Sequence, residues 1–409
     1  MPKKPNLLVL GASGGVANAF LHHLNAHRDL FGKLILLDKK KTVLNDRYID
    51  HKQLRYTFIH QKIDLPKKEK EYRSLLKRYN INIVLDITDM PSLLILESTN
   101  KAGVSYINTA LNDEEKTVYD LVQTIYPRKH KINGAPHILC TGMNPGAVNM
   151  WVRHGIEKYG VPKEITHFEY DTSMVAASWK PLSTWSIHEF LVETAYDPSA
   201  VALGRGKIKP LLPNAIERRE SLKPILEPIL KLPHYPEGFI VLHEENVTIS
   251  YKYDVPSKFM YAIHPKTMRE IIALYHKKKT ISKNDLILGD NTTEVLDGAD
   301  SIGVQLNYSD KKVYYFNSIP NIGIIGTNAT YTQVIIGIFS ALFTLLFEGL
   351  KPAVYFVEDL YKTQYKNHLF NNMRVQEFVF LKKNGKLHCT KYTPMVKLKH
   401  KNNLPLYVM

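Results

Sequence analysis

Cysteine is scarce in this chain of 409 residues, with only Cys140 and Cys389 present. Two widely separated cysteines exclude a disulfide framework and a cysteine-based metal site, so we expect a reducing compartment, the cytoplasm, and no metal. Long apolar runs are missing too. The longest spans residues 334–347, and a run of 14 residues favours a buried core helix over a membrane span. The first residues lack the continuous apolar region and the cleavage site of a signal peptide.

Acidic residues are fewer than basic ones: 39 Asp and Glu stand against 54 Lys and Arg, a formal net charge of +15. Such an excess permits contact with nucleic acids or anionic surfaces. Because no nucleic-acid-binding motif accompanies the lysine runs, the charge favours a solvated lysine-rich surface over a nucleic-acid partner. We expect no membrane partner either.

Lysine and arginine are absent from residues 181–204, where Trp185 is followed by the carboxylates of Glu189 and Glu193. An aromatic face attracts an organic cation through its quadrupole, and carboxylates attract one by Coulomb force. The same residues fit a helix capping box from Ser186 to Glu189, with Trp185 and Phe190 as a hydrophobic staple. The two interpretations are compatible, and the segment alone leaves both open.

The first 145 residues alternate short apolar runs with helical patterns, the order that a doubly wound parallel sheet requires. The expected strands are 7–10, 33–37, 56–59, 81–86, 105–108 and 136–140, and the expected helices are 16–24, 93–102 and 117–126. After a helix at 148–158, strand-like runs follow one another at 165–170, 238–242, 247–252, 258–263, 303–306 and 313–316. Runs of strands with few helices between them indicate a second domain with a largely antiparallel sheet.

These patterns predict an α/β fold in three parts: a Rossmann domain at 1–145, an α+β substrate domain at 146–325, and a C-terminal part at 326–409. The Pro- and Lys-rich residues 204–237 indicate a long excursion or a lid within the second part. In the third part we expect a return helix that packs on the Rossmann domain, and a helix at 357–370. A Lys-rich hairpin turning at Asn384-Gly385 ends the predicted order.

A glycine turn joins the first strand to the first helix, in the sequence Gly11-Ala-Ser-Gly-Gly-Val-Ala17. Gly11 permits the tight turn, Gly14 lets the backbone approach a pyrophosphate, and Ala17 allows close helix packing. Asp38 ends the second strand, where an acid binds ribose hydroxyls and repels a 2′-phosphate. We therefore expect NAD, although the lysines at 39–41 could serve NADP. The residues assigned to the cofactor are Gly11, Ser13, Gly14, Gly15, Val16, Asp38, Thr88, Thr109, Asn144 and Pro145.

A second motif, Gly142-Met-Asn-Pro-Gly-Ala-Val148, follows the strand at 136–140, at an edge where ligands sit in such sheets. With the Rossmann pattern before it, this motif resembles the saccharopine dehydrogenase-like superfamily. Later segments resemble, more narrowly, homospermidine synthases of the bacterial type. These segments fall in the family's order, at 168–172, 183–193, 238–245, 261–265, 296–304 and 328–334.

The resemblance implies an NAD-dependent transfer of an aminobutyl group between two putrescine molecules. One putrescine loses a hydride and becomes an iminium, the second adds, ammonia leaves, and the returned hydride gives homospermidine without net redox change. The family's site residues correspond to Trp185 for cation stabilisation, Glu193 or His243 for proton transfer, Glu169 for the distal ammonium, and Asn144 for orientation beside the cofactor. The resemblance also implies a homodimer.

The chain departs from the family pattern at Asn112, where the family carries a glutamate. A further family acid corresponds to Asp89 or, less well, to Asp86, and we assign Asp89 and Asn112 to the substrate. The identity of the amine therefore stays open.

Two other functions remain open. A saccharopine or carboxynorspermidine dehydrogenase-like enzyme, which joins an aldehyde or keto acid to an amine with NAD(P)H, would need an arginine pair for an α-carboxylate. Arg205, Arg218 and Arg219 are the only close candidates. A non-catalytic NAD-binding sensor is the third possibility, although the presence of both Trp185 and Glu193 speaks against it.

Overall fold

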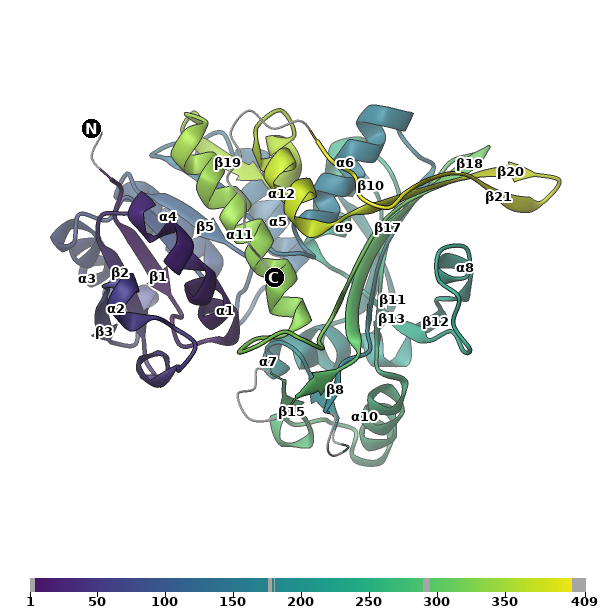
Figure 1. Ribbon diagram of the computed structural model, residues 1–409, viewed down its shortest axis with the longest axis horizontal. Coiled ribbons are helices and arrows are strands. Elements are labelled where there is room, and N and C mark those ends of the chain that lie inside the picture. The colour runs from purple at the N-terminus through teal and green to yellow at the C-terminus, as the bar shows by residue number, and fades with distance from the viewer. Residues whose placement is uncertain (1–3, 176–178, 180, 290–294, 399–409) are drawn as a thin grey trace. The chain divides into compact units, whose positions relative to one another are not determined.

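The structure is a computed structural model that describes residues 4–175, 179, 181–289 and 295–398 (Figure 1). The described chain divides into two compact units. Unit 1 holds residues up to 146 and residues 334–372, and unit 2 holds residues 147–333 and 373 onward. The chain therefore passes from one unit to the other three times.

Unit 1 contains a seven-stranded, wholly parallel sheet in the order β19-β6-β5-β4-β1-β2-β3. Its inner strands are short, fully buried apolar runs, as strands covered on both faces require. The strands are β1 (Leu7–Leu10), β2 (Leu34–Asp38), β3 (Thr57–His60), β4 (Ile83–Asp86), β5 (Ser105–Asn108), β6 (Pro136–Leu139) and β19 (Ala353–Phe356). The α-helices are α1 (Gly15–Leu24), α2 (His51–Leu54), α3 (Leu65–Arg78), α4 (Ser92–Lys101), α5 (Val118–Ile125) and α12 (Tyr365–Met373). Short 3₁₀ helices occupy Asn25–Leu30, Thr42–Asn45, Tyr126–Arg128 and Val357–Leu360.

Helix α11 (Ala329–Phe347) starts in unit 2 and continues into unit 1, where Phe339 packs on Phe20 of α1 with ring centroids 5.0 Å apart. Strand β19 then pairs with β6 at the sheet edge. By length and composition α11 could cross a membrane, but 78% of its most apolar window is buried, as expected of a core helix.

Unit 2 is built on a ten-stranded sheet, in which β14 and β7 form a parallel pair and the remaining pairs are antiparallel. Its strands are β7 (Glu164–Asp171), β10 (Ser199–Gly204), β11 (Lys207–Leu212), β12 (Arg219–Ser221), β13 (Glu237–Val241), β14 (Ser257–Ile263), β17 (Ala299–Asn307), β18 (Lys311–Pro320), β20 (Gln376–Lys383) and β21 (Lys386–Thr393). Two small sheets pair β8 (Met174–Val175) with β16 (Leu296–Asp297) and β9 (Leu182–Ser183) with β15 (Ile287–Leu288). The predicted α/β fold, a parallel sheet followed by a largely antiparallel one, is confirmed.

The helices of unit 2 are α6 (Ala147–Tyr159), α7 (Ile187–Leu191), α8 (Lys223–Leu226), α9 (Glu244–Tyr253) and α10 (Pro265–Lys278), with a π-helical turn at Val192–Tyr196 and 3₁₀ turns at Ala215–Glu217 and Lys283–Asp285. One face of the sheet carries a core around Phe239, Phe259 and Tyr261, and the other face a core around Phe168 and Met260. The two cores follow from the alternation of side chains along β13, β14 and β7.

Three expected elements are wrong. Residues 247–252 form helix α9 and not a strand, because His243 caps a first turn that carries Glu244 and Glu245. Residues 204–237 are no separate excursion, since β11 and β12 in this stretch belong to the large sheet. The single helix expected at 357–370 is a 3₁₀ turn followed by α12.

Candidate active site

The glycine turn of unit 1 has the shape that the sequence predicted. Gly11 has φ +78°, and a Cβ there would lie 2.3 Å from the carbonyl oxygen of Ile87, so no other residue fits without a shift. Gly14 precedes helix α1, whose N-terminus receives no side-chain cap among the described residues. The N–H groups of the turn itself donate to Leu37, Asp38 and Gly11, so the first N–H groups of α1 are the ones that face an anion such as a pyrophosphate.

Asp38 connects the glycine turn to the loop after β2. Its carboxylate accepts hydrogen bonds from the backbone N–H of Ser13 at 2.9 Å and of Lys40 at 2.7 Å. The hydroxyl of Ser13 in turn donates to the Lys40 carbonyl at 3.0 Å. These bonds hold the acid at the carboxyl end of β2, where it can receive ribose hydroxyls. The turn, the open helix start and this acid fit a nicotinamide dinucleotide.

Thr88 and Asn112 lie together beyond the ends of β4 and β5. The Asn112 side-chain amide donates to the Thr88 carbonyl at 3.0 Å, and the Thr88 hydroxyl donates to Asp86 at 2.6 Å. Burial raises the pKa of Asp86 to about 6 despite the hydrogen bonds from Thr88 and Tyr106. Asn112 therefore ties two loops together, whereas Asp89 is exposed on the same loop as Thr88.

The Asn144 motif folds back on itself after β6. The peptide bond between Asn144 and Pro145 is cis, and Gly142 bridges to Gly146. The Gly142 N–H also donates to the carbonyl of Thr109 at 3.3 Å, which links the motif to the loop after β5. The cofactor residues predicted from the sequence thus gather at the carboxyl ends of β1, β2, β4, β5 and β6.

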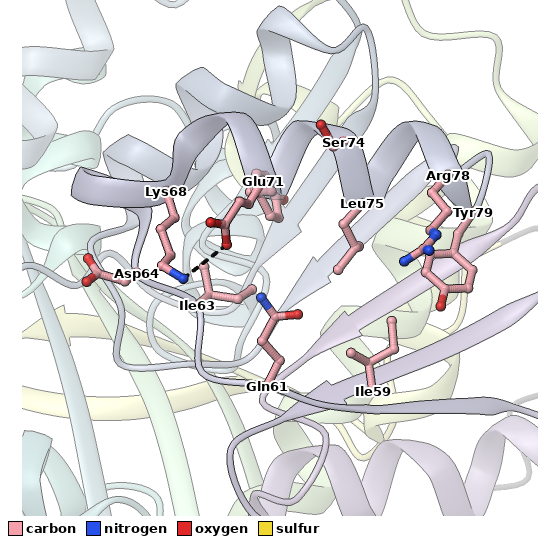
Figure 2. A pocket seen from close by; sticks show the side chains of 11 residues that line it. Ile59, Gln61, Ile63, Asp64, Lys68, Glu71, Ser74, Leu75, Arg78 and Tyr79 are labelled. Carbon is pink, nitrogen blue, oxygen red and sulfur yellow. Dashed lines mark ion pairs between the residues drawn. The ribbon is translucent and has the colours of Figure 1, made fainter.

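A cavity of about 470 Å³ elsewhere in unit 1 lies between β3 and α3 (Figure 2). Ile59, Gln61 and Leu75 line it, and Lys68 forms an ion pair with Glu71 at 3.2 Å on its rim. Its lining includes none of the residues predicted for the cofactor. This cavity is therefore distinct from the glycine turn.

In unit 2, the predicted acid Glu169 lies on the central strand β7 and is buried. Alternation along the strand puts His167, Glu169 and Asp171 on one face, with Tyr261 of β14 directly beside Glu169. Burial, with Glu169 and Asp171 nearby, raises the pKa of Tyr261 well above its usual range, so its phenol stays neutral. The face is therefore polar and acidic at its centre.

Two of the predicted residues, His243 and Glu193, are in direct contact. His243 follows β13 as the N-cap of α9, and its Nε2 lies 3.2 Å from a carboxylate oxygen of Glu193. On the other side, Nδ1 is 2.5 Å from Glu245 and 3.2 Å from Glu244. The imidazole is thus held between three carboxylates.

These carboxylates set the protonation of the cluster. Burial favours the neutral imidazole, but Glu245, Glu193 and Glu244 outweigh it and hold the pKa of His243 well above its usual range. Burial would likewise raise the pKa of Glu245, yet the charge and hydrogen bond of His243 keep it below the usual value. His243 is therefore an imidazolium at neutral pH, in contact with ionised Glu245.

Trp185 is half-buried and packs against the apolar core of the same sheet face. Its indole N–H donates to the Tyr261 hydroxyl at 3.0 Å, which fixes the ring beside the strand that pairs with β7. The Ser186 hydroxyl accepts from the Glu189 N–H at 3.3 Å, so the predicted N-cap of α7 is present. The cap and the cation-binding interpretation are compatible.

Sequence reasoning assigned no role to Tyr261, Glu245, Asp171 or Asp300, all of which are buried on or beside this face. The signal for Asp171 was available, because the period of two along 164–171 places it with Glu169. The partners of Asp300 and Glu245 depend on strand register and on a helix start that the sequence pattern did not indicate.

Residues 7–136 match the family model of the saccharopine dehydrogenase NADP binding domain. The homospermidine synthase of Legionella pneumophila, solved in complex with NAD, superposes with a TM-score of 0.73 at 18% identity, over 98% of this chain and 94% of that one. The chain has the fold of homospermidine synthase. Its N-terminal unit is a nicotinamide dinucleotide-binding domain, as the sequence predicted.

Other solved structures are less similar. The amine dehydrogenase of Mycobacterium smegmatis has a TM-score of 0.41 at 10% identity, covering 87% of this chain and 96% of that one. The WlbA dehydrogenase of Thermus thermophilus, in complex with NAD and alpha-ketoglutarate, has a TM-score of 0.36 at 11% identity, covering 88% and 95%. No curated protein sequence matches the chain.

Proposed function

We propose that this protein is an NAD-dependent enzyme that transfers an aminobutyl group between two putrescine molecules and releases ammonia, as a homospermidine synthase. The observation that carries the proposal is the buried acidic face of unit 2, where Glu169 and the cluster around His243 lie in a chain of net charge +15. The imidazolium of His243 supplies one positive charge to a face that carries the carboxyl groups of Glu169, Glu193, Glu244 and Glu245, so a bound cation would offset the negative charge that is left. A diamine at neutral pH is such a cation, and the shared fold supports this choice.

The candidate site residues of unit 2 have contacts that support a role for each of them. Glu193 touches the imidazolium of His243 at Nε2, so this pair can give a proton to a leaving amine and, once it has lost that proton, take one from a substrate ammonium. Glu169, buried on β7, would hold the distal ammonium. The Trp185 face, fixed through Tyr261, would stabilise a positively charged carbon or nitrogen by about 1–2 kcal/mol.

The glycine turn and Asp38 would hold the cofactor, and Asp38 at the ribose position favours NAD over NADP. When bound, this cofactor removes a hydride from an amine-bearing carbon and later returns it. The protein's own residues bind the amine, exclude water and exchange its protons. A homodimer and a cytoplasmic location stay predictions.

The arginines that a saccharopine or carboxynorspermidine dehydrogenase-like reaction would need already form ion pairs with carboxylates. Arg205 pairs with Asp254 at 2.7 Å, Arg218 with Glu220 at 2.6 Å, and Arg219 with Glu237 at 3.4 Å. Because each guanidinium already has a carboxylate partner within unit 2, none is set aside for a substrate α-carboxylate. This observation favours the diamine reaction.

The test is to incubate the purified protein with NAD⁺ and putrescine alone and to measure polyamines and ammonia. Homospermidine and ammonia should appear in equal amounts, with no net accumulation of NADH. Accumulation of NADH without homospermidine would indicate a simple dehydrogenase, and no product of either kind would leave the sensor function.

Replacing Trp185 by alanine should lower the rate of homospermidine formation about 5- to 30-fold, the loss expected from a desolvated cation–π contact. The affinity for NAD, measured by calorimetry, should stay unchanged. Trp179→Ala is the matched control, since the Trp179 indole donates instead to Glu270. Equal rates in both variants would remove the proposed role of Trp185.

A further inference from the structure

Two buried carboxyl groups face each other across adjacent strands of unit 2. Asp171 ends β7 and Asp300 lies on β17, and the two are direct partners in the antiparallel register. Their residues are 5% and 0% exposed. Directly opposed like charges destabilise a sheet, and burial increases the cost. Two ionised carboxylates in these positions would therefore be strongly unfavourable.

Two threonine hydroxyls connect the pair. Thr184 lies 2.7 Å from Asp171 Oδ2, Thr330 lies 2.6 Å from Asp300 Oδ2, and the two hydroxyl oxygens are 3.0 Å apart. The other oxygen of Asp171 accepts from the Ser173 N–H at 2.8 Å. The Asp300 Oδ1 atom is buried and has no hydrogen-bond partner among the described residues.

The number of available protons decides which protonation state satisfies the hydrogen bonds that run from Asp171 through the two threonines to Asp300. Each threonine has one proton to donate, so if both acids were ionised, Thr184 would donate to Asp171 and Thr330 to Asp300. The contact between the two hydroxyl oxygens would then contain no proton. One proton on Asp300 completes every contact, because Asp300 donates to Thr330, Thr330 to Thr184, and Thr184 to Asp171. It also leaves Oδ1 as a neutral carbonyl oxygen, which costs less to bury unpaired than a carboxylate oxygen.

The groups around the two acids favour the same protonation state, with one proton on Asp300. His167 and Glu169 on β7 and Tyr261 on β14 are titratable groups that share this face, and burial lowers the pKa of His167 to about 4, so its ring is neutral. Helix α11 and residues 182–184 contribute the hydroxyls of Thr330 and Thr184. Burial raises the pKa of both acids, and for Asp300 the charge of Asp171 raises it further, well above the usual range. Hydrogen bonds oppose the effect at both residues, from Ser173 and Thr184 at Asp171 and from Thr330 and Ser301 at Asp300.

We propose that Asp171 and Asp300 hold one proton between them, carried by Asp300 and ordered by Thr184 and Thr330, so that the pair presents the single negative charge of Asp171. Asp300 is then a neutral positioning residue and Asp171 contributes to binding a substrate cation. Only the identification of that cation as a diamine rests on the proposed function.

The proton assignment can be tested without substrate, by following thermal unfolding from pH 4 to 9. Asp300→Asn replaces a neutral donor by another, so its Tm should stay within about 2 °C of the unchanged protein near pH 5. A carboxyl whose pKa is raised on folding loses stability as pH rises above its unfolded value. The unchanged protein should therefore lose stability toward high pH relative to Asp300→Asn, whose Tm should exceed it there.

Asp171→Asn should lower the Tm at every pH, because its amide cannot accept from both the Ser173 N–H and Thr184. Thr330→Val should also lower the Tm, and Thr330→Ser should restore it. Asp310→Asn, at an exposed position, is the control for loss of one carboxyl. Equal destabilisation by the two asparagine variants, or no gain of Asp300→Asn at high pH, would overturn the assignment. Should Asp300→Asn fail to fold, the infrared carbonyl band of a protonated carboxyl decides the question: it should be present in the unchanged protein and shift to higher frequency in Thr330→Val, and its absence from the unchanged protein would overturn the assignment.

With putrescine as substrate, Asp171→Asn should raise the KM about tenfold, since it removes a charge near the bound cation. Asp300→Asn should raise the KM by less, because it leaves the charge of Asp171 in place, and the exposed control Asp310→Asn should not change it. An equal rise in both would contradict the proposal. If the unchanged protein does not turn over putrescine, the proposed function fails while the unfolding measurements still decide the proton assignment.

Discussion

At the scale of single residues, the protonation of His243 depends on a neighbour that the sequence motif did not single out. Glu245 touches Nδ1 at 2.5 Å and is completely buried, so it fixes both the ring orientation and the site of protonation. Nε2 is left facing Glu193 at 3.2 Å. In the proposed reaction, the proton exchanged with a substrate would be the one between His243 and Glu193, and Glu245 would act through the imidazole.

Glu245→Gln should lower the pKa of His243, because its largest favourable charge is removed. A histidine with a raised pKa adds stability below its unfolded pKa, and this stability is lost as pH rises through the folded pKa. In the variant the loss should begin at lower pH, and at pH 7 the variant should be less stable by about 1–3 kcal/mol. Histidine NMR titration and unfolding at several pH values measure both effects.

The control for this prediction is Glu227→Gln, whose carboxylate is largely exposed. It should change neither the titration of His243 nor the stability by more than about 0.5 kcal/mol. An unchanged pKa of His243 in Glu245→Gln would show that Glu193 and Glu244 suffice to keep the imidazole charged.

At the scale of elements, the sequence predicted those whose local signals and packing agree. The glycine turn, strand β1 and the hairpin turn at Asn384-Gly385 were correct, and both turn residues have positive φ as the pair requires. Helix α9 was taken for a strand because Val247, Thr248 and Ile249 are β-branched and, like Ser250 after them, buried. Strand β11 was missed because its lysines and Pro210 resemble a loop, although they are also typical of an edge strand.

The residues of the candidate site could be predicted where a sequence motif contains them, but the contacts that depend on strand register could not. Trp185, Glu193, Glu169 and His243 could be named from motifs, and the structure joins Glu193 to His243 directly. Asp300 could not be connected with Asp171, since strand register depends on the packing of the whole sheet and not on either segment alone.

The hairpin β20–β21 is attached to unit 2 through Glu377, a buried acid on β20. Glu377 accepts from Lys158 at 2.7 Å, from Lys391 at 2.6 Å and from the Tyr315 hydroxyl at 2.8 Å. Burial opposes its ionisation, but these donors lower the pKa of Glu377 to about 2. A lowered carboxyl pKa gives stability above its unfolded value, and this stability is lost as pH falls toward the folded pKa.

We expect Glu377→Gln to destabilise unit 2 by on the order of 3 kcal/mol at pH 7, a figure at the lower end because both lysines are partly exposed. The difference from the unchanged protein should shrink between pH 4.5 and about 2, where the acid becomes protonated. Urea unfolding over this range measures it, with Glu237→Gln on a surface pair as the control. A difference that does not depend on pH would mean that shape, and not charge, holds the hairpin.

At the scale of the whole molecule, neither unit is formed by one continuous stretch of the sequence. Strand β19 and most of α11 complete unit 1 only after the chain has built unit 2. A boundary drawn near residue 145 therefore separates β6 from the strand that covers its edge. It also removes Phe339 from Phe20 and Phe343 from His27, whose rings are 5.2 Å apart.

A shortened chain that ends at residue 146 should therefore not fold cooperatively, because it loses an edge strand and a helix whose large apolar side chains contribute about 1.5–3 kcal/mol each. Joining residues 1–146 to 334–372 through a flexible linker should restore a cooperative thermal transition and binding of NAD. Circular dichroism on heating and calorimetry with NAD⁺ measure the two properties. Cooperative unfolding and NAD binding by residues 1–146 alone would show that the returning segment is dispensable; failure of the joined chain would show that unit 1 needs unit 2 to fold.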